Sequence, residues 1–189
     1  MSSHHIVREK QEPALLILGF DNFDDEQLGQ LLEWSPTVLL AQGVYEKIAS
    51  MGIKIDAIIC TEKTEIAPQE CSRFIYTKKW QTTLQAAMEF IITQAYPAVN
   101  IISNAFAVHD FEAYLPLLDV VVFANNKKHY PIKNGFSKWE VSNTMIFIFG
   151  NITGHYGTKK IAEHSYITIS DGFFGFSFEQ NYLFIAHSL

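Results

Sequence analysis

The sequence predicts an α/β protein, with a doubly wound, mostly parallel sheet followed by a small antiparallel β-sandwich. In the first part of the chain, continuous apolar runs alternate with segments of helical period, which is the pattern of buried parallel strands and their crossover helices. From Leu118 onward, short β-rich runs are separated by turn signals such as KNG, NITGHYG and DGFFG. We therefore expect an N-terminal arm over residues 1–13, an α/β domain over 14–117 and a β-sandwich domain over 118–189.

The expected parallel strands of the first domain are five apolar runs, at residues 14–18, 37–41, 56–60, 73–77 and 98–103. Helices are expected between them. Acids at 24–26 suit the N-terminus of a helix, which favours negative charge. Gly52 is expected to end a short helix over 45–51. The clearest helix covers 81–95, because its apolar residues recur at the spacing of one buried face.

The second domain is expected to be built from strands alone. Its strongest strands are predicted at residues 145–149, 165–170 and 182–186. The fifteen Phe and eight Tyr of the chain favour sheet structure. The four phenylalanines of the GFFGFSF run exceed what a small sandwich needs for its own core, so we expect a homodimer with contacts through this domain: Phe173, Phe174, Phe176 and Phe178.

Composition excludes several classes of protein. The net charge of −6 argues against a nucleic-acid partner, since such proteins carry basic patches. No apolar run approaches the roughly 20 residues that span a bilayer, so no membrane partner is expected. Residues 1–13 lack the apolar stretch of a signal peptide. The two cysteines, Cys60 and Cys71, fit a reducing compartment, and we expect a cytoplasmic protein.

Candidate chemistry is expected beyond the carboxyl ends of the parallel strands, where ligands bind in open α/β sheets. Those ends carry the carboxylates Asp21, Glu62 and Asp110, and His109 is a possible acid or base. Glu62 with Lys63, and His109 with Asp110, are each either a catalytic couple or solvated polar neighbours. No phosphate-binding glycine motif follows any strand, and no histidine spacing indicates a metal site.

Four segments of the chain carry a resemblance to a known family. They are VLLAQGVYEKIASMGIKIDAIICTEKTEIAPQE, TKKWQTTLQAAMEF, NIISNAFAVHDFEAYLPLL and GFFGFSFEQNYLFIAHS. In order, spacing and strand–loop context they resemble thiamine pyrophosphokinase. The resemblance implies an α/β nucleotide-binding domain joined to a thiamine-binding β-sandwich, assembled as a homodimer. It also implies ATP and Mg²⁺ as cofactors if the family activity survives.

The sequence resembles the family in its scaffold, but it has other residues at most positions where the family has acids. Gln42 stands at the first Asp of an Asp-Gly-Gly motif, in which Gly43 is kept. Thr61 and Lys63 stand at the acids of a Gly-Asp-Phe-Asp-Ser loop, in which Thr64 matches the Ser. In the loop that opens the long helix, three acids are replaced and one Thr is matched: Trp80, Gln81 and Thr83 are the replacements, and Thr82 is the match. In the closing hairpin Ser177 is kept and Phe178 replaces an Asn, while His109-Asp110 resembles an Asp-His pair in reversed order.

The acids at the strand ends and the resemblance together give three groups of site residues. Catalytic residues would be Glu62, His109 and Asp110; cofactor-binding residues would be Gln42, Gly43, Thr61, Lys63, Thr64, Thr82 and Thr83; and substrate-binding residues would be Ser177 and Phe178. Because Thr, Lys, Gln and Trp cannot replace carboxylates around Mg²⁺, no metal ligand is assigned.

Three interpretations follow. The first is a thiamine-pyrophosphokinase-like protein that is catalytically impaired and retains a cleft for a nucleotide or thiamine-like molecule. The second is an active thiamine pyrophosphokinase with a rearranged Mg²⁺ site built from Glu62, Asp21 and Asp110. The third is a non-catalytic dimeric interaction protein.

Overall fold

The computed structural model describes residues 12–21, 23–34, 36–63, 65–69 and 72–189. Most of the expected N-terminal arm, Cys71 and the predicted site residue Thr64 lie outside these residues. The chain forms two compact units, the first comprising the described residues up to Asn104 with Pro116–Asp119, and the second comprising Ala105–Leu115 with Val120–Leu189. The chain therefore crosses between units three times, whereas a single boundary between 117 and 118 was predicted. No helix of the described residues is long and apolar enough to span a bilayer.

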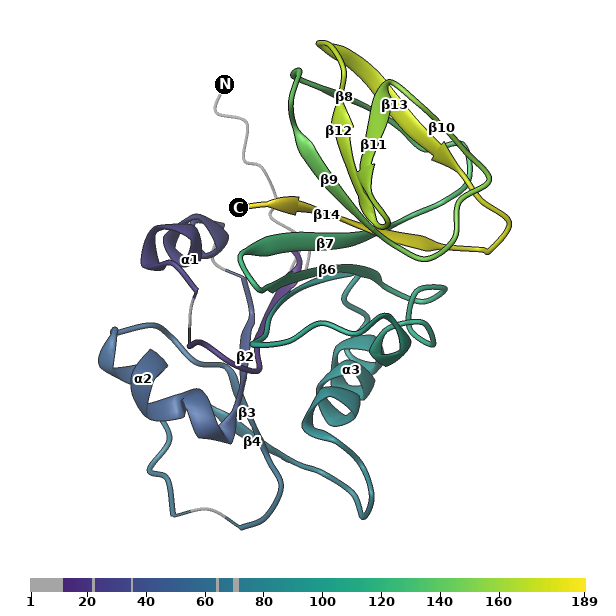
Figure 1. The fold of residues 1–189 in the computed structure, drawn as a ribbon. Helices are drawn as coiled ribbons and strands as arrows, with labels where there is room; N and C mark the ends of the chain where they lie inside the picture. The colour runs from purple at the N-terminus through teal and green to yellow at the C-terminus, as the bar shows by residue number, and fades with distance from the viewer. Residues whose placement is uncertain (1–11, 22, 35, 64, 70–71) are drawn as a thin grey trace, which may run out of the picture. The chain divides into compact units, whose positions relative to one another are not determined.

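The first unit is built on a parallel sheet (Figure 1). Its strands stand in the order β5-β1-β2-β3-β4, and each of these strands pairs with its neighbours in parallel. Each strand lies within one residue of its predicted bounds: β1 Ala14–Ile17, β2 Val38–Ala41, β3 Ala57–Cys60, β4 Arg73–Tyr76 and β5 Ala98–Ile102. The prediction succeeded because β1 and β3 are apolar along their whole length and buried on both faces, as strands in the middle of a parallel sheet are.

Three α-helices flank this sheet: α1 Asp25–Leu32, α2 Tyr45–Ser50 and α3 Thr83–Thr93, with a 3-10 turn η1 over Gln42–Val44. Asp24 caps α1 by accepting hydrogen bonds from the backbone N–H groups of Glu26 and Gln27. The chain moves outward from β1 to β4 and then returns to β5 beside β1. Right-handed crossovers therefore place α1 and α2 on one face and α3 on the other, as Figure 1 shows.

The second unit consists of two antiparallel sheets and a short 3-10 turn, η2 Val108–Asp110. One sheet holds β6 Asp119–Ala124, β7 Lys127–Ile132, β9 Met145–Phe149, β11 Thr158–Ala162, β12 Ser165–Thr168 and β14 Leu183–Ser188, in the order β11-β12-β9-β14-β7-β6. The other holds β8 Ser137–Glu140, β10 Gly154–Tyr156 and β13 Gly172–Ser177, in the order β10-β13-β8. The protein is thus α/β, with a mixture of parallel and antiparallel strands.

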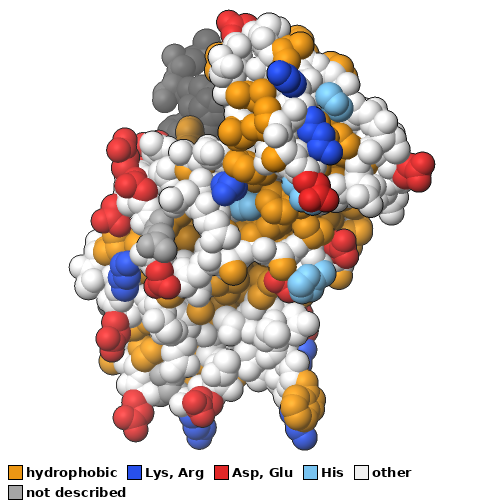
Figure 2. Space-filling model, viewed as in Figure 1, with side chains coloured by type: hydrophobic (Ala, Val, Ile, Leu, Met, Phe, Trp, Pro, Cys, Tyr) orange, Lys and Arg blue, Asp and Glu red, His pale blue; other side chains and the backbone are white. Residues whose placement is uncertain are grey.

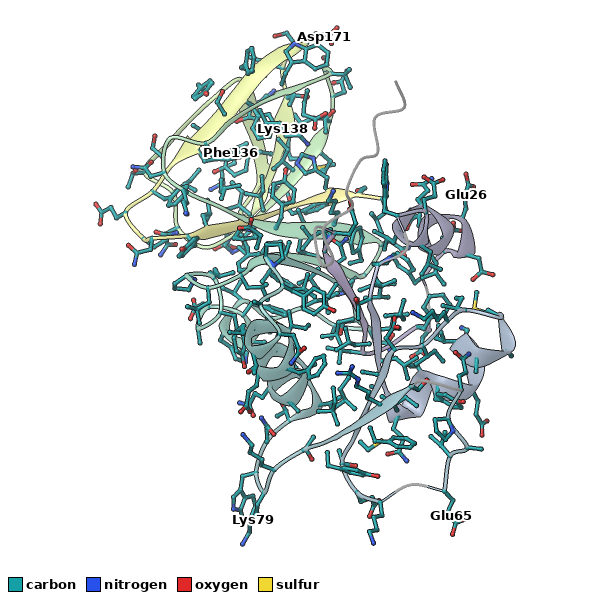
Figure 3. All side chains as sticks on the ribbon, turned by 180° about the vertical axis from the view of Figure 1, so that it is seen from behind. Glu26, Glu65, Lys79, Phe136, Lys138 and Asp171 are labelled. Atoms are coloured by element: carbon teal, nitrogen blue, oxygen red, sulfur yellow. The ribbon has the colours of Figure 1, made fainter. Side chains whose placement is uncertain are left out.

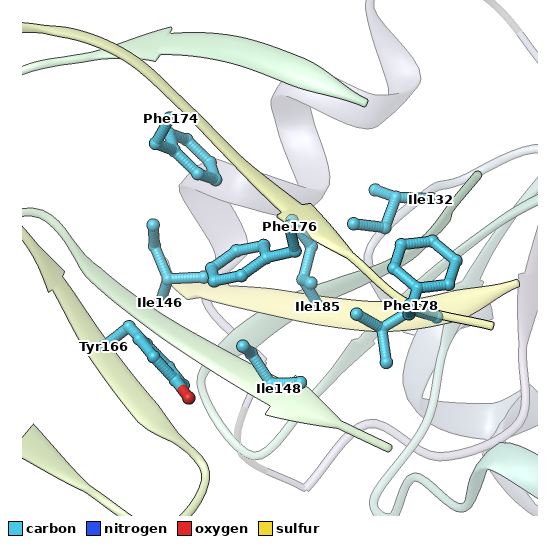
Figure 4. Close-up of a cluster of buried hydrophobic side chains, with 9 residues drawn as sticks. Ile132, Ile146, Ile148, Tyr166, Phe174, Phe176, Phe178 and Ile185 are labelled. Carbon is cyan, nitrogen blue, oxygen red and sulfur yellow. The ribbon is translucent and has the colours of Figure 1, made fainter. Parts of the chain in front are cut away.

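One buried cluster joins the two sheets of the second unit (Figure 4). Phe174 and Phe176 extend from β13 and meet side chains of the larger sheet, which are Ile132, Ile146, Ile148, Tyr166, Leu183 and Ile185. Phe178 joins the same cluster. The argument that these phenylalanines are surplus to the core was therefore wrong for three of the four, because only Phe173 remains exposed, at 64%.

Candidate functional site

The carboxyl ends of the five parallel strands meet at one edge of the first unit. Between β5 and β1 the strand order reverses, because β1 is followed outward by β2 while β5 returns to its other side. Such a reversal leaves a crevice above the sheet and is the usual ligand position in open α/β folds. The residues that follow β1 and β5 are therefore the first place to look for a site.

A hydrogen-bonded pair occupies this position. The Asn104 side-chain amide donates to Asp21 Oδ2 at 2.6 Å, and its Oδ1 accepts from the Asp21 backbone N–H at 3.2 Å. Both residues are exposed to solvent. The carboxylate is therefore held in one orientation, while none of the described residues forms a hydrogen bond or ion pair with its second oxygen. An oriented, accessible carboxylate of this kind accepts hydrogen bonds from hydroxyl or amino groups of a ligand.

Gly19 makes room for the pair. A Cβ built at Gly19 would lie 2.5 Å from Asn104 Cγ and 2.6 Å from its Oδ1, which is closer than real contacts allow. The backbone N–H groups of Leu18 and Gly19 both point to the carbonyl of Ile102, at 2.8 and 3.4 Å. A side chain at residue 19 would therefore collide with Asn104 where the end of β1 lies against the end of β5.

A lysine lies on the other side of the same segment. Lys47, on α2, donates from Nζ to the Phe20 carbonyl at 2.8 Å, and its ammonium lies 4.5 Å from the centre of the Phe20 ring. Phe20 itself is buried and packs near Phe23. These contacts fix the Gly19–Asp21 backbone and bring a cation near the Asp21 segment. Sequence reasoning counted Asp21 among the acids but missed Lys47 and Asn104.

The described residues that follow β3 directly form no organised site. Thr61, Glu62 and Lys63 are all exposed, and none of them forms a hydrogen bond or ion pair with another described residue. Cys60, just before them, is fully buried, and burial raises the pKa of its thiol, which disfavours the nucleophilic thiolate. Gln42 and Gly43 lie in η1 at the end of the neighbouring strand β2.

The polar residues of the loop after β4 already have structural roles. Thr82 caps α3 through a reciprocal pair of hydrogen bonds with Gln85, and Thr83 is the first residue of that helix. Gln81 donates to Glu89 at 2.8 Å, and Lys78 forms an ion pair with the same carboxylate. These bonds to Lys78 and Gln81 hold the pKa of Glu89 below its usual range.

These loops do not fit Mg²⁺. Within the described part of the chain, no group of three or more His, Cys, Asp or Glu side chains is arranged to hold a metal ion. Figure 2 shows Asp and Glu side chains scattered over the visible face. Lys63 brings a positive charge to the loop, and the Thr82 hydroxyl is engaged as a helix cap. Because Mg²⁺ needs carboxylate oxygens, no chemical step through this metal is derived for these residues.

The remaining predicted residues belong to the second unit. His109 and Asp110 lie in η2, are exposed, and approach each other at 3.4 Å between Nε2 and Oδ1. Ser177 is exposed at the end of β13, whereas Phe178 is only 3% exposed and packs in the core. The Phe178 side chain therefore packs within the core of its own unit.

No protein-family model matches the sequence, and no curated protein sequence matches it. Solved structures do. Thiamine pyrophosphokinase from Bacillus subtilis is 14% identical with a TM-score of 0.60, and the match covers 93% of this chain and 98% of that one. Thiamin pyrophosphokinase from Candida albicans is 11% identical with a TM-score of 0.61, covering 94% and 90%. The chain has the thiamine pyrophosphokinase fold. A Lactobacillus plantarum protein also shares it, at 11% identity and a TM-score of 0.67, with coverage of 94% and 98%.

The thiamine pyrophosphokinase fold confirms the resemblance drawn from the sequence at the level of architecture. At these identities the fold is shared while the side chains at the strand ends differ, so activity has to be argued from this chain's own residues. Those residues give one organised polar pair, Asp21 with Asn104, and, within the described part of the chain, no cluster of three or more side chains that could hold a metal ion.

Proposed function

We propose that the protein is a thiamine-pyrophosphokinase-like binding protein that holds a nucleotide- or thiamine-like small molecule and does not transfer pyrophosphate. The single observation that supports this is the Asp21–Asn104 pair beyond β1 and β5, where open α/β sheets bind ligands. Asp21 would accept a hydrogen bond from a ligand hydroxyl or amino group, and its orientation by Asn104 reduces the entropy cost of binding.

The absence of pyrophosphoryl transfer follows from the donor set. Transfer between phosphates depends on metal charge bridging their oxygens. Gln42, Thr61 and Lys63 stand where the resemblance places acids, and none of them supplies a carboxylate. A lysine in that position repels a metal cation and at most contacts a phosphate directly.

Thermal denaturation with added ligands tests the binding proposal. Thiamine, adenosine and ATP would each be added at about 100 times an estimated Kd, with and without Mg²⁺. A bound ligand should raise the melting temperature by roughly 5 °C or more, because binding to the folded state alone stabilises it by about 2.7 kcal/mol at that excess. The shift should disappear in Asp21→Ala and persist in the matched control Glu62→Gln, whose carboxylate is also exposed.

Two outcomes contradict the proposal. If no probe shifts the melting temperature of the native chain, a retained nucleotide- or thiamine-like site is wrong. If ATP shifts it only with Mg²⁺, and Glu62→Gln or Asp110→Asn removes the shift, a relocated metal site is supported instead.

A second proposal concerns assembly, and a specific surface favours it. Phe173 and Trp139 are direct cross-strand neighbours on the outer side of the β10-β13-β8 sheet, exposed by 64% and 51%. The Tyr156 ring lies on the same side of the sheet, because a Cβ built at Gly175 would be 2.7 Å from that ring. The Tyr156 hydroxyl donates a hydrogen bond to Ser137 Oγ. We call Trp139, Tyr156 and Phe173 the aromatic face.

We propose that the aromatic face pairs with its equivalent on a second copy to form a homodimer. The charged residues of β8, Lys138 and Glu140, alternate to the opposite side of the sheet, so the face combines aromatic enrichment with depletion of charge, as interface centres do. A stable dimer needs about 800 Å² from each partner, of which this face would form the centre. Light scattering should show a dimer that Trp139→Lys converts to a monomer. If the native chain is a monomer in solution, the homodimer proposal is wrong, and the ligand proposal is unaffected.

A further inference from the structure

Among the described residues, no strand pairs with the outer side of β4, which forms an open edge of the first unit's sheet. In the order β5-β1-β2-β3-β4, β4 pairs with β3 and stands at the end. The backbone N–H of Arg73 donates to Asp56 at 3.0 Å, and that of Thr77 donates to Cys60 at 2.9 Å. Because backbone groups alternate along a strand, those of Phe74 and Tyr76 point to the open side. Two N–H groups and two carbonyls therefore face outward.

A pocket lies beside this edge, between β4 and α3. Its volume is about 210 Å³, with an apolar lining from Ile75, Ala86 and Phe90. Its polar rim is the hydrogen-bonded group of Lys78, Gln81 and Glu89. The combination of an apolar floor and a fixed polar rim suits one apolar side chain presented by a neighbouring strand.

A tight turn displays an aromatic ring at the end of the same edge. The Gln81 N–H donates to the Lys78 carbonyl at 3.0 Å, and the Gln81 side chain accepts from the Lys78 N–H at 2.9 Å, which fixes the turn. Trp80 stands at its apex with φ of 68° and an exposed fraction of 91%. Positive φ disfavours a side chain as bulky as Trp, so a residue without a β-carbon would suit this turn better.

The edge carries positive charge although the whole chain is acidic. Arg73 on β4 is exposed, Lys78 lies on the pocket rim, and Lys79 stands beside Trp80 with its ammonium 5.4 Å from the indole centre. Figure 3 shows Lys79 projecting from the end of the loop. The carboxylate of Glu89 balances one of these three cations. A chain segment that follows this edge would thus be favoured if it carried acidic side chains.

We propose that the open edge of β4 docks an extended, acidic peptide segment of a partner protein. The segment adds to the sheet as a further strand by pairing with the outward backbone groups of Phe74 and Tyr76. It places one apolar side chain in the pocket beside α3 and stacks against Trp80. Backbone pairing supplies the affinity, while the pocket and the cations select the sequence.

Tyr76→Pro tests the backbone pairing directly. Proline removes the outward N–H of residue 76 and leaves the bonds to β3 intact, since prolines are tolerated on the open side of edge strands. Tyr76→Ala is the matched control, because it removes the same ring and keeps the N–H. The probe is a capped peptide of about nine residues, a length typical of strands, in which glutamate alternates with leucine.

Binding would be measured through tryptophan fluorescence of the full chain. The native chain should bind the probe, and Tyr76→Pro should weaken binding about tenfold or more relative to Tyr76→Ala, as expected when a backbone hydrogen bond is lost. The fluorescence change should be absent in Trp80→Phe and retained in Trp34→Phe, whose Trp is also exposed, at 72%. A probe with lysine in place of glutamate should bind more weakly.

Three results would overturn the proposal. They are no binding of the glutamate probe up to about 1 mM, unchanged binding by a probe N-methylated at alternate amides, and equal affinity of Tyr76→Pro and Tyr76→Ala. Self-association of the native chain that Tyr76→Pro abolishes would instead identify a second copy as the occupant of this edge.

Discussion

The Asn104 side chain forms two hydrogen bonds with Asp21, which lies 83 residues earlier in the sequence. Its amide nitrogen donates to Asp21 Oδ2 at 2.6 Å, and its Oδ1 accepts from the Asp21 backbone N–H at 3.2 Å. The two residues meet because β5 returns to the far side of β1, and they remain in contact because Gly19 leaves the space that Asn104 fills. Asp21, a candidate acid from the sequence, thus forms an organised polar pair with Asn104, which the sequence did not indicate, in a space that Gly19 leaves open.

Gly19→Ala should destabilise the protein by about 1 kcal/mol, at the low end of overpacking costs. The added methyl meets the end of the Asn104 side chain, which is exposed and can turn outward. In an Asn104→Gly background the same substitution should cost less, because the three atoms nearest to the added methyl all belong to the Asn104 side chain. Urea unfolding of the two single variants and the double variant measures the coupling, and strictly additive free energies would contradict the contact.

His129 gives the second unit a defined pH dependence. Its ring is 2% exposed, stacks on Phe106 with centres 4.1 Å apart, and contacts the Ala124 carbonyl through Nε2 at 3.2 Å. Since a carbonyl only accepts, Nε2 carries the proton, and among the described residues Nδ1 has no hydrogen-bond partner. Burial lowers the pKa of His129 to about 4, an effect that Lys127 reinforces.

Stability should fall as the pH drops from about 6.5 toward 4. The unfolded His129 takes up a proton near pH 6.5 and the folded one only near pH 4, so the unfolded state binds more protons in this window. The loss should be about 2–3 kcal/mol for this residue. Unfolding free energies at pH 7 and pH 4.5 should differ less in His129→Phe than in the native chain, and the exposed His164→Phe should leave the difference unchanged. A native-like pH difference in His129→Phe would show that other groups cause it.

The alternating burial of the GFFGFSF run is also testable. Phe174 is fully buried and Phe173 is 64% exposed, although they are neighbours. Phe174→Ala should cost about 3–5 kcal/mol because it leaves a cavity in the core cluster. Phe173→Ala should change the free energy of unfolding by less than about 0.5 kcal/mol. Denaturant unfolding of the two variants under identical conditions measures the contrast, and similar costs would mean that the strand register is wrong.

The strands of the first unit could be predicted from the sequence, whereas the long-range contacts between elements could not. Buried runs such as 14–18 have only one possible strand assignment, so the strand bounds in the first unit were predicted within a residue. The return of β5 beside β1, which joins Asp21 to Asn104, depends on long-range pairing that no local pattern encodes. Residues 105–115 were assigned to the first domain by position, but Phe106 and Phe111 stack with each other and contact Phe184 of the second unit. The alternate spacing of Phe174 and Phe176 was a signal for burial that the dimer argument overlooked.

Trp80 should be better replaced by glycine than by alanine. Its φ of 68° is costly for any residue with a β-carbon and free for glycine. Trp80→Gly should therefore be more stable than Trp80→Ala by about 1 kcal/mol, which thermal or urea unfolding of the pair would measure. The same comparison at Trp34, outside this turn, should favour alanine. Equal stability of the two Trp80 variants would indicate a different turn conformation.

The protein should show little or no Mg²⁺-dependent pyrophosphorylation of thiamine. The loops after β2 and β3 offer Gln42, Thr61 and Lys63 at three of the positions where the resemblance places acids, and none is a carboxylate. Removing a preorganised electrostatic group commonly lowers the rate by about 10²–10³-fold, and even a partial combination of such losses leaves negligible turnover. Purified protein would be incubated with thiamine, ATP and Mg²⁺, and thiamine pyrophosphate would be quantified beside an active thiamine pyrophosphokinase as the control. Robust turnover that disappears in Glu62→Gln or Asp110→Asn would establish a relocated metal centre and overturn the proposal of a catalytically impaired site.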